Sequence, residues 1–174
     1  MTGNEPAGSR APEPKQWLPN ADAKCFLCQA AAEYESSADE ARELLIACRR
    51  ESTVVVLNRY PYNNGHLLIS PRRHVGELGQ MTHEEHLGCM EQLTGLTQLY
   101  RQQLGADGFN IGLNLGRAAG AGLPGHVHWH LVPRWVGDNN FMPVLAGTRV
   151  IPQSLEALWE WLVGALDKSN RQSS

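Results

Sequence analysis

The segment GHVHWHLV, residues 125–132, places three histidines in strict alternation with apolar side chains. On a β-strand, side chains two residues apart share a face, so the pattern predicts a strand, His126–Val132, with its imidazoles on one side. A single histidine is most often a hydrogen-bonded core residue or a surface residue. The chain has only seven histidines, however, and three of them lie here. Burying three imidazoles without partners costs desolvation at each, so we expect a metal, an anion or a reacting group on that face.

Two kinds of chemistry suit such a face. Three imidazoles can bind a catalytic zinc with an open position for water, as in a metal-dependent hydrolase. Alternatively, one imidazole attacks phosphorus while the others handle protons and charge. The preceding loop favours phosphorus chemistry, because glycines let backbone N–H groups approach phosphate oxygens closely; these glycines are Gly116, Gly120, Gly122 and Gly125. A glycine-rich loop on its own is usually only a flexible connection.

The remaining patterns predict an α+β fold. Apolar and β-branched runs indicate strands at 44–48, 53–57, 66–70, 109–115 and 126–132. Thr82 and Glu85 form the capping box of a helix that continues to Gly105, and a second amphipathic helix begins near Leu155. We therefore expect an antiparallel sheet of about five strands with one long central helix and a C-terminal helix.

A chain of 174 residues, 42% of them hydrophobic, suits one domain. Residues 1–20 are rich in Gly, Pro, Asn and Ser, so we expect a flexible N-terminal arm. Residues 21–168 are then a single domain, and residues 169–174 a polar tail.

Charge and hydropathy exclude several classes of function. The chain has 15 Lys and Arg against 18 Asp and Glu, which disfavours binding of nucleic acid. It contains neither a membrane-spanning apolar run nor the apolar centre of a signal peptide, so we expect a cytoplasmic protein without a membrane partner. Its four cysteines do not suggest a disulfide framework; Cys25 and Cys28 form a CxxC, for which we expect metal or redox chemistry.

Residues 126–132 match the motif HφHφHφφ, in which φ is apolar, at all seven positions. The chain thus resembles the histidine triad (HIT) superfamily of nucleotide hydrolases and transferases. Asn58 followed by His66 resembles the superfamily's nucleotide-binding segment, and the sequence NLG, residues 114–116, resembles its Asn-x-Gly before the phosphate loop. The resemblance covers about residues 24 to 140.

The resemblance implies roles for individual residues. The middle histidine, His128, attacks the α-phosphorus of a nucleotide ester and forms a covalent nucleotidyl-histidine. His130 contacts the bridging oxygen and assists the leaving group, while His66 and the loop amides stabilise the phosphoryl charge. Asn58 binds the ribose, although an asparagine that serves a turn fits the sequence equally well.

On the phosphate side the resemblance implies that Asn114 lies near the phosphate or the bridging oxygen. The loop contacts are Gly116, Arg117, Gly120, Gly122 and Leu123. Leu123 stands where many members have Ser or Thr, so its contact comes from the backbone. Arg117 can add a charge for a phosphate acceptor, and a solvated loop arginine is the alternative.

Members that carry a CxxC bind a structural zinc through both cysteines, a later histidine and the first triad histidine. The matching set here is Cys25, Cys28, His74 and His126. Two thiolates and two imidazoles close a tetrahedral site, so one zinc per chain would support the fold rather than catalyse. A redox pair or a chance spacing remains the alternative for the CxxC alone.

The segment PRWVGDNNFMPV, residues 133–144, resembles bacterial diadenosine tetraphosphate phosphorylases. That branch transfers adenylyl from a dinucleoside polyphosphate to inorganic phosphate. With water as acceptor, the same first step gives a hydrolase of dinucleoside polyphosphates, nucleoside phosphoramidates or adenylylated compounds. A nucleotide-binding protein without turnover is the third alternative. The resemblance also implies a homodimer.

Overall fold

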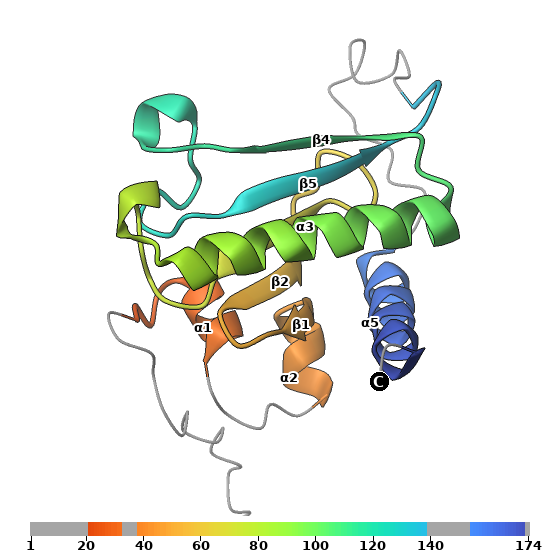
Figure 1. The fold of residues 1–174 in the computed structure, drawn as a ribbon, viewed down its shortest axis with the longest axis horizontal. Helices are drawn as coiled ribbons and strands as arrows, with labels where there is room; N and C mark the ends of the chain where they lie inside the picture. Colours follow the sequence, from red (N-terminus) through yellow and green to blue (C-terminus); the bar gives the residue numbers. More distant parts are fainter. Residues whose placement is uncertain (1–20, 33–37, 139–153, 173–174) are drawn as a thin grey trace, which may run out of the picture.

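A five-stranded antiparallel sheet forms the centre of the computed structural model, which describes residues 21–32, 38–138 and 154–172 (Figure 1). Its strands lie in the order β1-β2-β3-β5-β4. They are β1 (Ile46–Arg49), β2 (Thr53–Leu57), β3 (Leu67–Pro71), β4 (Gly108–Leu113) and β5 (Trp129–Arg134). The predicted α+β class with an antiparallel sheet is confirmed.

The long helix α3 (His83–Leu104) crosses one face of the sheet (Figure 1). Its N-terminus has the expected capping box, in which the Thr82 side chain accepts from the Glu85 amide and the Glu85 side chain accepts from the Thr82 amide. Gly105 ends the helix in the left-handed conformation, with φ of 62°. Leu87 and Met90 continue the apolar spacing of three and four residues that predicts the buried face of this helix, but they are 50% and 44% exposed.

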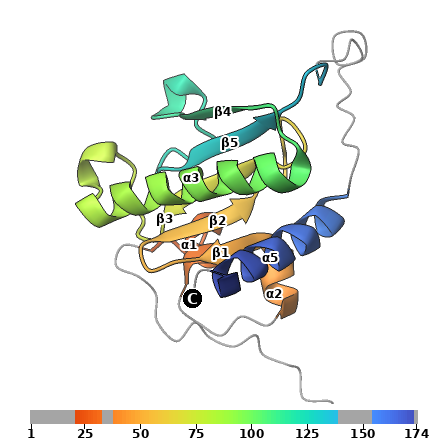
Figure 2. The same cartoon turned by 45° about the vertical axis from the view of Figure 1, so that its right-hand side comes forward.

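The two faces of the sheet carry different layers. Val55 and Leu57 of β2 pack into the larger core with α3 and α5 (Leu155–Gln172), which lies against β1 (Figure 2). Val54 and Val56 face the opposite side and pack with α1 (Phe26–Ala31). Because β2 is covered on both faces, all five of its residues are buried. The second short helix, α2 (Ala38–Glu43), contacts β1.

Two strands end earlier or begin later than the sequence predicts. Leu45 adopts a φ of 55° in the turn after α2, so β1 begins at Ile46 rather than at Leu44. At the other edge, the ladder between β4 and β5 ends with the pair Leu113 and Trp129. Asn114 therefore lies in the loop rather than in the predicted strand.

The predicted arm, residues 1–20, lies outside the described residues, and so does the second half of the segment PRWVGDNNFMPV, residues 139–144. Helix α5 continues to Gln172, through part of the segment that composition predicted as a polar tail. Trp159 anchors this helix by donating its indole N–H to the Ile46 carbonyl at 2.8 Å. The apolar spacing from Leu155 onward therefore predicted the helix but not its end.

Candidate functional site

The three alternating histidines do not share one strand face. Strand β5 begins at Trp129, so only His130 lies in the sheet, opposite Leu68 of β3. The predicted strand start at His126 is wrong because Pro71, at the end of β3, has no N–H to continue the ladder. The Ser70 hydroxyl instead donates to the Val127 carbonyl at 2.8 Å. The histidines thus fall into two neighbouring groups, His126 with the cysteines and His128 with His130.

Four side chains gather between α1 and the start of β5, with their ligand atoms within 4.8 Å of one another: Cys25, Cys28, His74 and His126. Sγ of Cys25 lies 3.3 Å from Nδ1 of His126, and Sγ of Cys28 lies 3.1 Å from Nδ1 of His74. Both cysteines and His126 are buried. The structure therefore brings together all four residues of the predicted metal set.

The donor set fits zinc. Tetrahedral zinc with typical bond lengths separates a sulfur from a nitrogen ligand by about 3.6 Å, close to the separations seen here. The Nε2 atom of His126 lies 2.9 Å from the Pro71 carbonyl, which can only accept, so Nδ1 carries the lone pair that faces the thiols. Burial raises the pKa of the Cys25 thiol to about 12 and lowers the pKa of His126 to about 4. A bound cation favours the thiolate and so opposes the effect of burial on the pKa of the thiol.

Two arginines hold the cysteine-bearing helix against the sheet. Arg72 donates twice to the carbonyl of Ala31, at 3.1 and 2.8 Å, and Arg49 donates to the carbonyl of Ala30. Cations at a helix C-terminus satisfy carbonyls that the short helix leaves open. Sequence reasoning missed both arginines, because nothing in their spacing indicates which carbonyls they reach.

His128 has its ring orientation fixed by the backbone. Its Nδ1 lies 2.8 Å from the carbonyl oxygen of His126, and a carbonyl only accepts, so Nδ1 carries the proton. With the proton on Nδ1, it is Nε2 that can present a lone pair as the nucleophilic nitrogen of the imidazole. The ring centroids of His128 and His130 are 5.1 Å apart.

His66 lies behind His130 rather than at the surface of the site. It is fully buried, and its Nε2 is 2.9 Å from Nδ1 of His130. Tyr62, which sequence reasoning did not select, stacks on His66 with a centroid distance of 4.9 Å and an interplanar angle of 23°. Burial and the nearby His128 lower the pKa of His130, so this ring is neutral at neutral pH.

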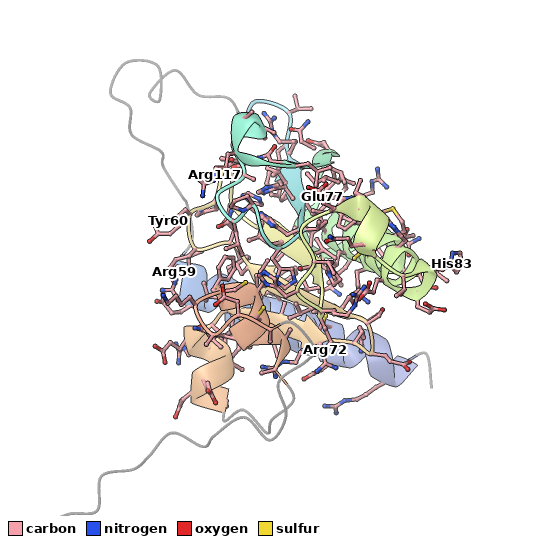
Figure 3. All side chains as sticks on the ribbon, turned by 90° about the vertical axis from the view of Figure 1, so that its left-hand side faces the viewer. Arg59, Tyr60, Arg72, Glu77, His83 and Arg117 are labelled. Carbon is pink, nitrogen blue, oxygen red and sulfur yellow. The ribbon has the colours of Figure 1, made fainter. Side chains whose placement is uncertain are left out.

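An apolar cavity of about 270 Å³ opens beside Asn58. Its walls come from α1, the turn before β1 and the neighbouring strands: Phe26, Leu44, Leu45, Val56, Leu57, Asn58, Arg59, Tyr60 and Leu68. Tyr60 is 81% exposed at this cavity. Figure 3 shows Arg59 and Tyr60 on the same side of the molecule as Arg117. A cavity of this size and polarity suits a planar aromatic group.

The loop between β4 and β5 carries the predicted phosphate contacts. Gly116 and Gly120 have φ of 73° and 80°, which non-glycine residues rarely adopt, and they flank the short helix η2 (Arg117–Ala119). Arg117 and Gly122 are exposed, and Asn114 is partly buried. The Leu123 side chain packs against the apolar cluster beneath α1, so it anchors the loop.

A HIT domain model matches residues 42–136 of this chain. AP-4-A phosphorylase of Mycobacterium tuberculosis strain H37Rv is 43% identical over 113 residues, which cover 65% of this chain and 58% of that protein. Bis(5'-nucleosyl)-tetraphosphatase [asymmetrical] of Schizosaccharomyces pombe is 31% identical over 90 residues, covering 52% of this chain and 49% of that one. The chain therefore spans about half the length of these relatives.

Among solved structures, a Zn-bound histidine triad family protein from Mycobacterium smegmatis superposes with a TM-score of 0.60 and 26% identity. The match covers 74% of this chain and 87% of that one. It agrees with the sheet and helix arrangement described above. Within the parts of the chain that the structure describes, no helix is both long and apolar enough to span a membrane.

Proposed function

Because this chain belongs to the HIT domain family, we propose that it transfers a nucleotidyl group from the α-phosphate of a dinucleoside polyphosphate, such as diadenosine tetraphosphate, to inorganic phosphate. The reaction runs through a covalent AMP–histidine on His128. One observation carries the proposal: the hydrogen bond from Nδ1 of His128 to the His126 carbonyl leaves Nε2 free to attack. The relative from M. tuberculosis, named as a phosphorylase, supports phosphate as the acceptor.

In the first step, the lone pair of His128 Nε2 forms a bond to the α-phosphorus. The bond from phosphorus to the bridging oxygen breaks, and its electron pair leaves with the departing nucleotide. Nδ1 of His128 keeps its proton, so the adduct is cationic at the ring, and the His126 carbonyl stabilises that charge. His130 donates a hydrogen bond from Nε2 to the bridging oxygen, and the leaving nucleoside triphosphate needs no proton to depart at neutral pH.

The nucleotide is held on both sides of the reacting phosphorus. The cavity beside Asn58 accepts the base, and Asn58 contacts the ribose. Asn114 and the backbone amides of the loop around Gly116, Gly120 and Gly122 contact the phosphates. Leu123 supplies no hydroxyl there, so the phosphate contacts at that position come from the backbone.

In the second step, an oxygen of hydrogen phosphate attacks the phosphorus, and the P–N bond breaks with its electron pair returning to His128 Nε2. The product is ADP, and the proton of the attacking phosphate passes to solvent. A dianionic acceptor needs fixed positive potential, which Arg117 supplies together with the loop amides. Hydrolysis differs only in that water attacks the adduct, and the relative named as a tetraphosphatase supports this as the alternative.

Zinc would be held by Cys25, Cys28, His74 and His126, and with four protein ligands it would support the fold rather than supply a reacting water. Bound metal would hold α1 and the start of β5 together. His130 lies in β5, and His128, the proposed nucleophile, lies immediately before that strand. The four ligands would therefore position the reacting segment without contacting phosphorus.

The assembly we propose is a homodimer. β4 lies at the edge of the sheet, and three of its residues, Asn110, Ile111 and Gly112, are exposed. Ile111 is 50% exposed on this edge. Among the described strands β4 pairs only with β5, and an edge strand with an apolar side chain is a natural surface for a second copy, because pairing satisfies its backbone groups.

Product analysis tests the proposed function. Diadenosine tetraphosphate is incubated with the protein, with and without labelled inorganic phosphate. We expect ATP and labelled ADP, formed only when phosphate is present. AMP and ATP at a rate independent of phosphate would identify a hydrolase, and bound nucleotide without turnover would identify a binding protein.

A further inference from the structure

The side chain of Asn58 has its orientation fixed by the backbone of the following turn. Its Oδ1 accepts the amide N–H of Tyr60 at 3.0 Å. A backbone N–H always donates, so this contact identifies the oxygen of the carboxamide and turns the nitrogen the other way. That nitrogen, Nδ2, lies 3.1 Å from Nδ1 of His66.

Nδ1 of His66 faces a second donor. The backbone N–H of Tyr62 points to it with an N···N distance of 3.1 Å. Two N–H groups thus converge on one ring nitrogen, which must carry a lone pair rather than a proton. Because His66 is fully buried, the neutral ring holds its proton on Nε2.

The proton on Nε2 of His66 determines the next ring. Nε2 lies 2.9 Å from Nδ1 of His130 and donates to it. Nδ1 of His130 is then an acceptor, so neutral His130 carries its own proton on Nε2. His66 and His130 therefore both carry the proton on Nε2 and the lone pair on Nδ1.

We propose that Asn58 is a positioning residue that, together with the Tyr62 amide, sets the tautomer of His66 and through it the tautomer of His130. The proposal rests on the proposed function for its catalytic consequence, because the Nε2–H of His130 is the donor to the bridging oxygen. It adds to the ribose contact a role directed at the leaving group. A carboxamide does this and a carboxylate does not, since only the carboxamide donates.

The two roles of Asn58 predict opposite rankings of activity for Asn58→Asp and Asn58→Ala. Ribose hydroxyls donate readily to a carboxylate, so a residue that only binds ribose tolerates Asn58→Asp better than Asn58→Ala. A residue that must donate to His66 tolerates Asn58→Ala better, because the Tyr62 amide still holds the tautomer. Asn58→Asp instead favours a proton on Nδ1 of His66, which displaces that ring from the Tyr62 amide.

The tautomers are read directly by long-range ¹⁵N–¹H NMR of ¹⁵N-histidine-labelled protein without nucleotide, with His66 identified by loss of its signals in His66→Gln. In the wild type we expect unprotonated Nδ1 and protonated Nε2 for both His66 and His130. In Asn58→Asp we expect a proton on Nδ1 of His66. Gln98→Glu, the same change of charge on the exposed face of α3, should leave both rings as in the wild type.

Kinetics on the same proteins give the second measurement. We expect kcat to fall by about 100-fold in Asn58→Asp and by about 10-fold in Asn58→Ala, while loss of the ribose contact raises KM in Asn58→Ala. A protonated Nδ1 of His66 in the wild type overturns the proposal, and so does an unprotonated one in Asn58→Asp. Full kcat in both variants, with only KM changed, overturns it as well. If the wild type turns over no nucleotide, the proposed function fails, while the NMR result still decides the tautomer assignment.

Discussion

The carbonyl oxygen of His126 accepts a hydrogen bond from Nδ1 of His128 at 2.8 Å. His126 therefore contacts two groups at once, since its ring faces Cys25 and Cys28 while its backbone carbonyl orients the imidazole of His128. The alternation of histidines in the sequence does not put three imidazoles on one strand face, because β5 begins only at Trp129. In the proposed mechanism it places a metal ligand, a nucleophile and a leaving-group contact in succession along one extended segment.

Replacing one cysteine ligand tests the zinc assignment. Cys25→Ser should lower the zinc content well below one per chain and destabilise the fold by about 3 kcal/mol, a fall in Tm of about 6 to 12 °C. Cys48→Ser, outside the cluster, is the matched control and should keep its zinc. Cobalt-substituted wild type should show thiolate charge-transfer absorption, measured alongside metal content and thermal unfolding. Metal bound by His128 and His130, with activity lost on chelation while the fold survives, contradicts the assignment.

The turn before His66 depends on Gly65. This residue has a φ of 80°, and a Cβ added there would lie 3.1 Å from Pro133 and 3.2 Å from Tyr100. Gly65→Ala should therefore lower the free energy of unfolding by about 1 to 3 kcal/mol. Gly95→Ala, in the exposed middle of α3 with no atom within 4 Å, should raise it by about 0.5 to 1 kcal/mol. Urea unfolding of both variants checks the opposite signs, and equal effects would contradict the packing described at Gly65.

Asp138 links the turn before β3 to the end of β5, and its contribution depends on pH. Arg134 donates to both of its carboxylate oxygens, at 2.7 and 2.8 Å, and Asn63 donates at 2.9 Å. The hydrogen bonds from Arg134 lower the pKa of Asp138 from 3.8 to about 2. A lowered carboxyl pKa stabilises the fold above the unfolded-state value of 3.8, and the contribution is lost as the pH falls through about 2.

Asp138→Asn should therefore cost about 1 to 2 kcal/mol at neutral pH, a range that allows for solvent screening of the partly exposed Arg134. The difference from the wild type should shrink as the pH falls below about 4. Chemical unfolding over a series of pH values measures it, and Asp167→Asn on the exposed side of α5 is the control. A difference that stays constant with pH would show that the ion pair is not its source.

The sequence predicts most of this fold because apolar periodicity and capping are local signals. The run Thr53–Leu57 is β2 without change, and the capping box at Thr82 and Glu85 begins α3. Local signals fail where tertiary contacts decide. The alternation predicts His126 in the strand, but the ladder between β3 and β5 ends before it because Pro71 has no N–H. Leu87 and Met90 keep the helical spacing but are exposed.

The candidate site was predictable in its residue types but not in its arrangement. The residues of the triad, and likewise the two cysteines of the CxxC, lie close together in the sequence and have known chemistry, so the sequence predicts them as site residues. The position of His66 behind His130 depends on two neighbouring strands and their register, which no spacing reveals. Tyr62 donates to His66 through its backbone N–H, a group that every residue except proline has, so the residue type does not reveal this role.

Arg117 tests which acceptor resolves the adduct. If its charge holds phosphate, Arg117→Ala should raise the phosphate concentration needed for half-maximal rate about tenfold and slow adduct formation much less. Arg171→Ala, at the exposed end of α5, is the control and should change neither value. Steady-state rates over a range of phosphate concentrations, with single-turnover adduct formation beside them, separate the two effects. An unchanged phosphate requirement would make Arg117 a solvated loop residue.

The covalent adduct on His128 is the central claim, and mass spectrometry of a quenched reaction tests it most directly. The wild type is mixed with diadenosine tetraphosphate without phosphate, quenched in base to preserve the P–N bond, and mapped by peptide fragmentation. We expect one AMP group on His128, and none in His128→Ala, which should still bind nucleotide because the ribose and phosphate contacts remain. AMP attached to another residue, or near-normal turnover by His128→Ala, would contradict the account.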